Sequence, residues 1–141
     1  MRYDELSEMV DRDLRIDDTE LDVESIKTPQ LHNKYLKIYT QLSLSLKKTK
    51  DDRKVLYKEK WEYYTGKSSP EVYKENPFDL KILRSDVQMY IDADKEYQEA
   101  TQKEEYIKMM ADYSERILKE INNRGFIINN TIKWKQFLHG E

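Results

Sequence analysis

The sequence predicts an all-α protein with two long amphipathic helices and shorter helices towards both ends. Only three glycines and three prolines interrupt its 141 residues. Charged residues make up 38% of the chain, and its apolar residues recur at the three- and four-residue spacings that place them on one face of a helix. Because so charged a chain has little core per residue, we expect it to bury further surface against a partner or against copies of itself.

The first 26 residues are predicted to form an acidic N-terminal arm. They hold ten acidic and three basic residues, which gives a net charge of −7. Within this arm, residues 4–14 place Leu6, Met9 and Val10 on one face of a short amphipathic helix. Since like charges repel phosphates, we expect the arm to contact a protein and to add nothing to nucleic-acid affinity.

The first long helix is predicted over residues 29–66. Thr28-Pro29 indicates its start, because the first helical position needs no backbone N–H and proline has none. Residues 21–27, just before this start, give no clear pattern. Apolar residues on the helix then follow a heptad spacing at Leu31, Tyr35, Ile38 and Leu42. Gly66 can adopt the left-handed conformation that ends a helix.

Residues 67–84 are predicted to form a loop, because Pro70 and the pair Asn76-Pro77 interrupt helical structure. A short helix is then predicted to begin after Ser85-Asp86 and to continue through Ile91.

The second long helix is predicted to begin at Asp92 or Asp94 and to end near Asn122. It belongs to a helical C-terminal region, residues 85–141, that we expect to mediate oligomerisation. Its apolar stripe, the best candidate for self-association, consists of Ile107, Met110, Ile117 and Ile121.

A break is predicted at residues 123–125, where Asn-Arg-Gly indicates a helix end. Asn129 or Asn130 then caps a terminal helix. This helix presents the apolar residues Ile132, Trp134, Phe137 and Leu138. The 141 residues are predicted to form a single domain.

A basic and aromatic stretch, residues 47–66, is the candidate binding surface. Residues 47–60 carry seven basic residues against three acidic ones. The rings of Tyr57, Trp61 and Tyr64 lie four and three residues apart, so they form one stripe on a helix. Cations attract phosphates and rings stack on bases, a combination suited to single-stranded nucleic acid. The alternative is that the rings are core residues and the lysines form a solvated face.

No residue set for catalysis or metal binding is visible in the sequence. The chain has no cysteine and only two histidines, His32 and His139. Gly66-Lys67-Ser68 looks like the end of a phosphate-binding loop, but position 61 is tryptophan where that motif needs glycine. No apolar run approaches the roughly 18 residues of a membrane span. We therefore expect a soluble intracellular protein that is not an enzyme and uses no cofactor or metal.

Three ordered segments carry a resemblance to a known family. They are RIDDTEL at residues 15–21, KEKWEYYTG at residues 58–66, and NRGF at residues 123–126 together with Ile128. This set resembles the UvsY family, the recombination mediators of tailed phages, over nearly the whole chain. The resemblance implies a protein that binds single-stranded DNA and contacts the single-strand-binding protein. Such a protein would help load a RecA-type recombinase in the cytoplasm of the infected host cell.

The resemblance also implies a homo-oligomeric ring, taken to be a heptamer, and a set of DNA contacts. In the family's central motif, two basic residues separated by one position contribute to DNA binding, and they correspond here to Lys58 and Lys60. Glu59 and Trp61 depart from the family pattern. The neighbouring cations that we expect to help are Arg53, Lys54 and Lys67. The candidates for base stacking are Tyr57, Trp61 and Tyr64. The alternative function is a helical oligomeric adaptor or scaffold that does not bind DNA directly.

Overall fold

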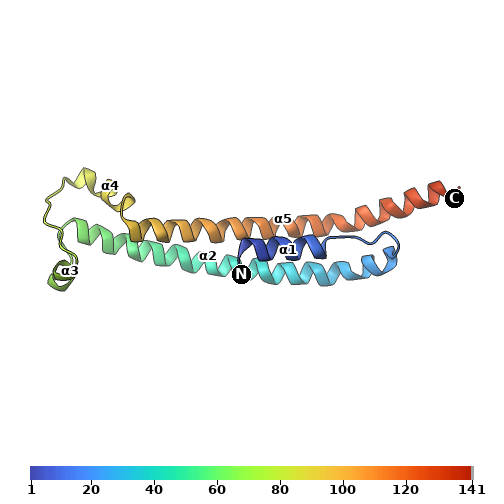
Figure 1. Cartoon of the computed structure of the whole chain (residues 1–141), viewed down its shortest axis with the longest axis horizontal. Helices are drawn as coiled ribbons and strands as arrows, with labels where there is room; N and C mark the ends of the chain where they lie inside the picture. The colour runs from blue at the N-terminus through green and yellow to red at the C-terminus, as the bar shows by residue number, and fades with distance from the viewer. Residues whose placement is uncertain (141) are drawn as a thin grey trace. The chain divides into compact units, whose positions relative to one another are not determined.

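The chain is all-α, as predicted, in a computed structural model that describes residues 1–140. Helices account for 81% of the chain, and the described residues contain no strand. The elements are α1 (Tyr3–Asp13), α2 (Leu21–Tyr64), α3 (Pro70–Glu75), the 3₁₀ helix η1 (Arg84–Asp86), α4 (Val87–Asp92) and α5 (Lys95–Leu138) (Figure 1). They form two compact units. Unit 1 comprises Met1–Ser43 and the chain from Met109 onward, and unit 2 comprises Leu44–Lys108.

Unit 1 is built from α1, the first half of α2 and the second half of α5. The predicted amphipathic helix near the N-terminus is confirmed as α1, which lies alongside both long helices (Figure 1). Its Leu6 and Val10 are buried in a common core with residues of α2 and α5. The buried members of this core are Leu6, Val10, Tyr35, Met110, Ile117 and Ile121. The acidic N-terminal arm of residues 1–26 therefore contributes part of a hydrophobic core.

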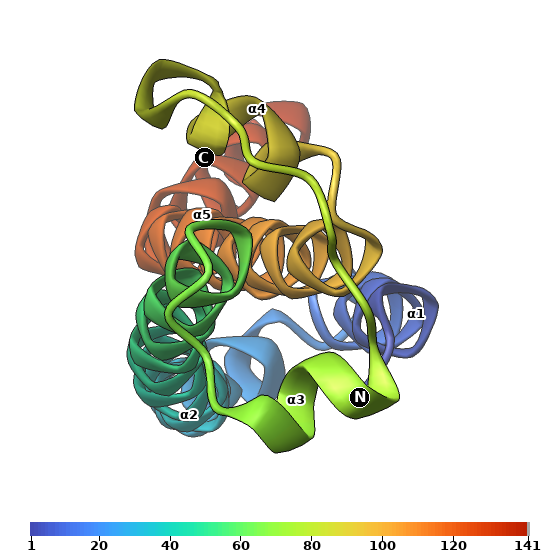
Figure 2. The same ribbon diagram turned by 90° about the vertical axis from the view of Figure 1, so that its left-hand side faces the viewer.

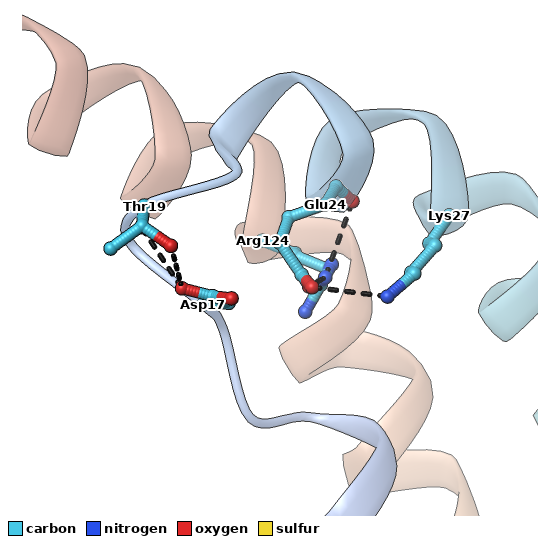
Figure 3. Close-up of polar contacts among 5 residues, drawn as sticks. All are labelled: Asp17, Thr19, Glu24, Lys27 and Arg124. Atoms are coloured by element: carbon cyan, nitrogen blue, oxygen red, sulfur yellow. Dashed lines mark hydrogen bonds and ion pairs between the residues drawn. The ribbon is translucent and has the colours of Figure 1, made fainter.

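The first long helix begins earlier than predicted. It starts at Leu21, so Pro29 lies inside the helix, where it removes one backbone hydrogen bond. The turns of α2 that precede Pro29 are stabilised by a buried ion pair between Glu24 and Arg124 (Figure 3). Arg124 Nη2 donates to the Glu24 carboxylate and, at 3.2 Å, to the Glu24 backbone carbonyl. Lys27 Nζ donates to the same carboxylate at 3.1 Å. A tertiary contact thus outweighs the local signal for a helix start.

The turn that leads into α2 is stabilised by Asp17 and Thr19 (Figure 3). The Asp17 carboxylate accepts the Thr19 backbone N–H at 3.0 Å and its hydroxyl at 2.6 Å. An aspartate that bonds the backbone two residues later is a common way to close a polar turn.

The second long helix is continuous through residues 123–125, so the predicted break and the separate terminal helix were wrong. Gly125 does not adopt the left-handed conformation that ends helices. Ile121 and Ile128, seven residues apart, are both buried, and Arg124 between them is only 2% exposed. Because packing continues on this face of α5, one glycine is not enough to end the helix.

Unit 2 contains the end of α2, the short helices and the start of α5. The predicted end of α2 is confirmed: Gly66 has a φ of 79°, and the Lys67 N–H donates to the Glu62 carbonyl at 2.8 Å. The predicted loop at residues 67–84 was partly wrong, because Pro70 begins α3 within it. An extended segment then links α3 to η1 and α4 (Figure 2), which together form the predicted short helix.

The unit 2 core consists of Val87 and Ile91 from α4 and Tyr97 from α5, all buried. Asp94 caps α5, as one of the two predicted alternatives, because its Oδ1 accepts the Tyr97 backbone N–H at 3.0 Å. This core is the surface against which the aromatic stretch of α2 packs.

Candidate functional site

The aromatic stripe of α2 packs against the unit 2 core. Tyr57, Trp61 and Tyr64 are half-buried there. The Tyr57 hydroxyl donates to Gln88 Oε1 at 2.6 Å, and the Tyr64 hydroxyl donates to Asp94 Oδ2 at 2.7 Å. This packing corresponds to the alternative in which the rings are core residues. Base stacking by the same rings stays a prediction.

One flank of this stripe, which we call the paired flank, consists of Arg53 and Lys60. Arg53 Nε lies 2.5 Å from Glu104 Oε2 on α5. Lys60 Nζ lies 3.2 Å from Asp94 Oδ2 and 2.9 Å from Glu96 Oε2. The two cations lie seven residues apart from each other on α2, so they share one face of the helix. Each is neutralised by carboxylates of the same chain.

The contacts around Lys60 shift the pKa of both partners towards the charged forms. Burial acts to lower the pKa of Lys60, but hydrogen bonds to Glu96 and Asp94 and their charges raise it overall. Burial acts to raise the pKa of Asp94, but hydrogen bonds from Tyr64, the Tyr97 backbone and Lys60 lower it overall. Lys60 and Asp94 are therefore both charged at neutral pH, and they form an ion pair.

The opposite flank, which we call the open flank, consists of Lys47, Lys54 and Lys58. These residues are spaced seven and four apart, so they form one stripe, and all three are exposed. The Lys58 side chain is 78% exposed, and it forms a 3.8 Å ion pair with Glu62. Exposed pairs of this kind are weak. Lys67, just beyond the end of α2, is also exposed.

A cavity of about 590 Å³ lies beside the paired flank. Its charged lining residues are one cation, Lys60, and four carboxylates, Glu59, Glu62, Asp94 and Glu96. The surplus of negative charge makes this cavity unfavourable for a phosphate group. Of the predicted DNA contacts, the structure therefore leaves Lys54, Lys58 and Lys67 accessible and holds Arg53 and Lys60 in ion pairs.

The stripe predicted for self-association packs mainly inside the chain. Ile107 is half-buried in unit 2, whereas Met110, Ile117 and Ile121 are 1%, 7% and 1% exposed in unit 1. Oligomerisation through these four side chains stays a prediction, and three of them have a core role within the subunit.

A different apolar surface is exposed along the last turns of α5. Trp134 and Phe137 are 60% and 70% exposed, and their rings stack with centroids 5.5 Å apart. The other exposed apolar residues of this surface are Phe126, Ile127, Ile132 and Leu138. By helical spacing these residues, apart from Ile132, share one face of α5, and exposed apolar patches are typical of protein interfaces.

Sequence reasoning missed the buried pair of Glu24 and Arg124. Glu24 lies in a stretch without clear periodicity, and Arg124 lies in the predicted break. The available signal was the seven-residue spacing of Ile121 and Ile128, which continues the apolar face of α5 past Arg124.

Metal-binding clusters and membrane-spanning helices are both absent from the described part of the chain. Within residues 1–140, no three His, Asp or Glu side chains are grouped so that they could hold a metal ion. None of the described helices combines the length and the apolar character needed to cross a membrane.

Three comparisons with known proteins agree with one another. The family described as "Recombination, repair and ssDNA binding protein UvsY" matches residues 9–141. The recombination protein uvsY of Enterobacteria phage T4 is 23% identical over 141 residues, which is the full length of both chains. Two crystal structures of the bacteriophage T4 recombination mediator protein UvsY, lattice types II and IV, share the fold with TM-scores of 0.86 and 0.83. They are 24% and 23% identical to this chain, and the matches cover 99% and 97% of it and 98% of each T4 chain. The chain belongs to the UvsY family of recombination, repair and single-stranded-DNA-binding proteins.

Proposed function

We propose that this protein is a recombination mediator whose open flank on α2 binds single-stranded DNA. In this role it promotes the loading of a RecA-type recombinase onto DNA covered by single-strand-binding protein, in the cytoplasm of the infected host cell. The observation that supports this DNA-binding surface is the exposed stripe of Lys47, Lys54 and Lys58. Within residues 1–140, these lysines form no ion pair with a carboxylate of α5. The T4 relative is described as a recombination mediator, which supports the same role here.

The open flank is suited to contacts with the DNA backbone. Lysine heads on flexible stems bind phosphates regardless of base sequence, and each such ion pair releases counterions from the DNA. The few lysines of one subunit give weak binding. A ring of subunits repeats the stripe, so that later binding events become intramolecular and the total affinity rises.

Loading of the recombinase then needs no chemical step. DNA held along the subunits is less available to single-strand-binding protein and more available to a recombinase that prefers the held form. Differential binding alone shifts these populations. Contacts with both partner proteins complete the proposed role.

The DNA-binding surface is tested by the double substitution Lys54→Ala and Lys58→Ala. We expect weaker binding to labelled oligo-dT in fluorescence anisotropy. The salt slope, which is the slope of the logarithm of the binding constant against the logarithm of the salt concentration, should decrease in magnitude. The decrease should be about 0.7 for each lysine–phosphate contact that is lost, multiplied by the number of engaged subunits. Helicity and assembly mass should not change, because both side chains are exposed.

The matched control for this test is Lys74→Ala with Lys81→Ala, which removes the same charge from exposed positions outside α2. Equal reductions in affinity in the two double variants would show that net charge and not the open flank determines affinity. If the natural protein does not bind oligo-dT at all, the adaptor alternative replaces the proposal.

Self-association into a homo-oligomeric ring, a heptamer in our proposal, is assigned to the exposed apolar surface at the end of α5. We expect Trp134→Ala with Phe137→Ala to lower the mass measured by light scattering after size exclusion, because both rings are exposed and would be buried by another copy. Lys133→Ala with Gln136→Ala, exposed neighbours on the same turns, is the control. An unchanged mass in the ring-removing variant would place the interface elsewhere.

A further inference from the structure

Lys58 and Lys60 point in different directions although only one residue separates them. On an α-helix, two positions correspond to a rotation of about 200°, so the two side chains leave α2 on nearly opposite sides. The exposed fractions agree with this geometry: the Lys58 side chain is 78% exposed and that of Lys60 is 18% exposed. One strand of DNA that follows the open flank therefore does not meet Lys60 in the same subunit.

Lys60 instead joins α2 to the start of α5. Its ammonium group contacts Asp94 and Glu96 and lies 5.9 Å from the centre of the Tyr63 ring. Asp94 also accepts a hydrogen bond from Tyr64, so two side chains of α2 converge on the residue that caps α5.

Arg53 makes an equivalent connection two turns earlier on α2. Its guanidinium contacts Glu104 and the Tyr97 hydroxyl of α5. The two connections lie on the same flank. Together they oppose rotation of α2 about its own axis within unit 2, and such rotation would change the direction in which the open flank faces.

Displacement of these carboxylates by DNA is electrostatically unfavourable. A phosphate that approached Lys60 would have to replace two carboxylates and enter a cavity lined by two further ones, Glu59 and Glu62. Lys58 offers its charge to solvent without such competition, apart from its weak ion pair with Glu62.

We propose that the two lysines divide their roles: Lys58 contacts the DNA backbone, whereas Lys60 is a positioning residue that acts through Asp94 and Glu96. Lys60 holds α2 in the rotation that presents the open flank. This inference rests on the proposed function, because it assigns the roles of two residues at the proposed DNA-binding site.

The test compares Lys58→Met with Lys60→Met in the full-length protein. Methionine keeps most of the stem and removes the charge. Oligo-dT affinity is measured by anisotropy across a range of salt concentrations, and stability by thermal unfolding followed by circular dichroism. We expect Lys58→Met to reduce the salt slope by about 0.7 per engaged subunit and to leave the unfolding midpoint unchanged. Lys60→Met should lower the midpoint by about 4 °C and weaken binding by the same factor at every salt concentration, with no change in slope.

Two further variants test the connection itself. Lys60→Arg keeps a cation that can pair with both carboxylates, and we expect it to restore the midpoint and the affinity. Glu96→Gln alone should lower the midpoint of thermal unfolding. In a protein that already carries Lys60→Met, Glu96→Gln should lower the midpoint no further. Glu99→Gln removes the same charge from an exposed position of α5 and is the control.

The outcomes separate this inference from the proposed function. A reduced salt slope with an unchanged midpoint in Lys60→Met would overturn it, because that pattern indicates a direct bond to phosphate. Tighter binding with a steeper slope in Glu96→Gln, but not in Glu99→Gln, would overturn it as well, since freed Lys60 would then be reaching DNA. If Lys58→Met leaves affinity and slope unchanged, the proposed DNA surface fails. The midpoints of the Lys60 and Glu96 variants still decide whether Lys60 positions α2.

Discussion

Arg124→Leu is expected to destabilise the protein by about 3–5 kcal/mol, because it removes the buried partner of the buried Glu24 carboxylate and leaves only the exposed Lys27 beside it. Arg124 and Glu24 side chains are only 2% and 7% exposed, so water cannot take the place of the guanidinium. Urea unfolding followed by circular dichroism gives the free energy of unfolding. Arg116→Leu, at an exposed position of the same helix, is the control and should change that free energy by less than about 0.5 kcal/mol.

A double-mutant cycle with Glu24→Leu separates the pair from its surroundings. Replacement of both residues by leucine should cost much less than the sum of the single changes, because no uncompensated charge remains. Strictly additive effects would show that the two side chains do not interact energetically.

The same pair predicts a dependence of stability on pH. Burial acts to raise the pKa of Glu24, but hydrogen bonds from Lys27 and Arg124 and their charges lower it overall. A carboxyl group whose pKa is lowered by folding stabilises the protein above its ordinary pKa. This contribution is lost as the pH falls through the lowered value in the folded state. Glu24→Gln should therefore flatten the acid side of the stability curve.

Leu6→Ala is expected to lower the free energy of unfolding by about 2–5 kcal/mol, the usual range for truncation of a fully buried leucine. Leu6 is 0% exposed, although it lies near the N-terminus in the most acidic part of the chain. The same substitution at Leu44, which is 65% exposed, is the matched control and should have little effect. The measurement is again urea unfolding.

The Leu6 result also determines how deletions at the N-terminus are interpreted. If Leu6→Ala and Leu44→Ala have the same small effect, α1 is a loosely attached arm and can be removed to test its binding to partner proteins. If the expected destabilisation is observed, deletion of residues 1–26 disrupts the unit 1 core, and any decrease of DNA binding in that deletion reports on folding.

The elements that the sequence predicted well are those whose signals lie within a few residues. Gly66 ends α2 because glycine adopts the left-handed conformation of a helix C-terminus without a steric penalty. This signal is contained in the residue itself. The apolar spacing of residues 4–14 predicted α1 because it depends on helical periodicity alone. The errors at Pro29 and at residues 123–125 have the opposite origin, since contacts between distant segments override weak local signals at both places.

The sequence by itself determined the all-α class, the two long helices, the family and the basic stretch with its aromatic stripe. Only the tertiary structure decided which flank is free, because Arg53 and Lys60 meet their carboxylates through the packing of α2 on α5 within unit 2. It also decided that α1 belongs to a core and that Glu24 meets Arg124, one hundred residues away in the chain. Periodicity describes which residues share a face of one helix. It does not specify the rotation and register with which that face packs against another helix. These two variables determine which charges are paired and which remain exposed.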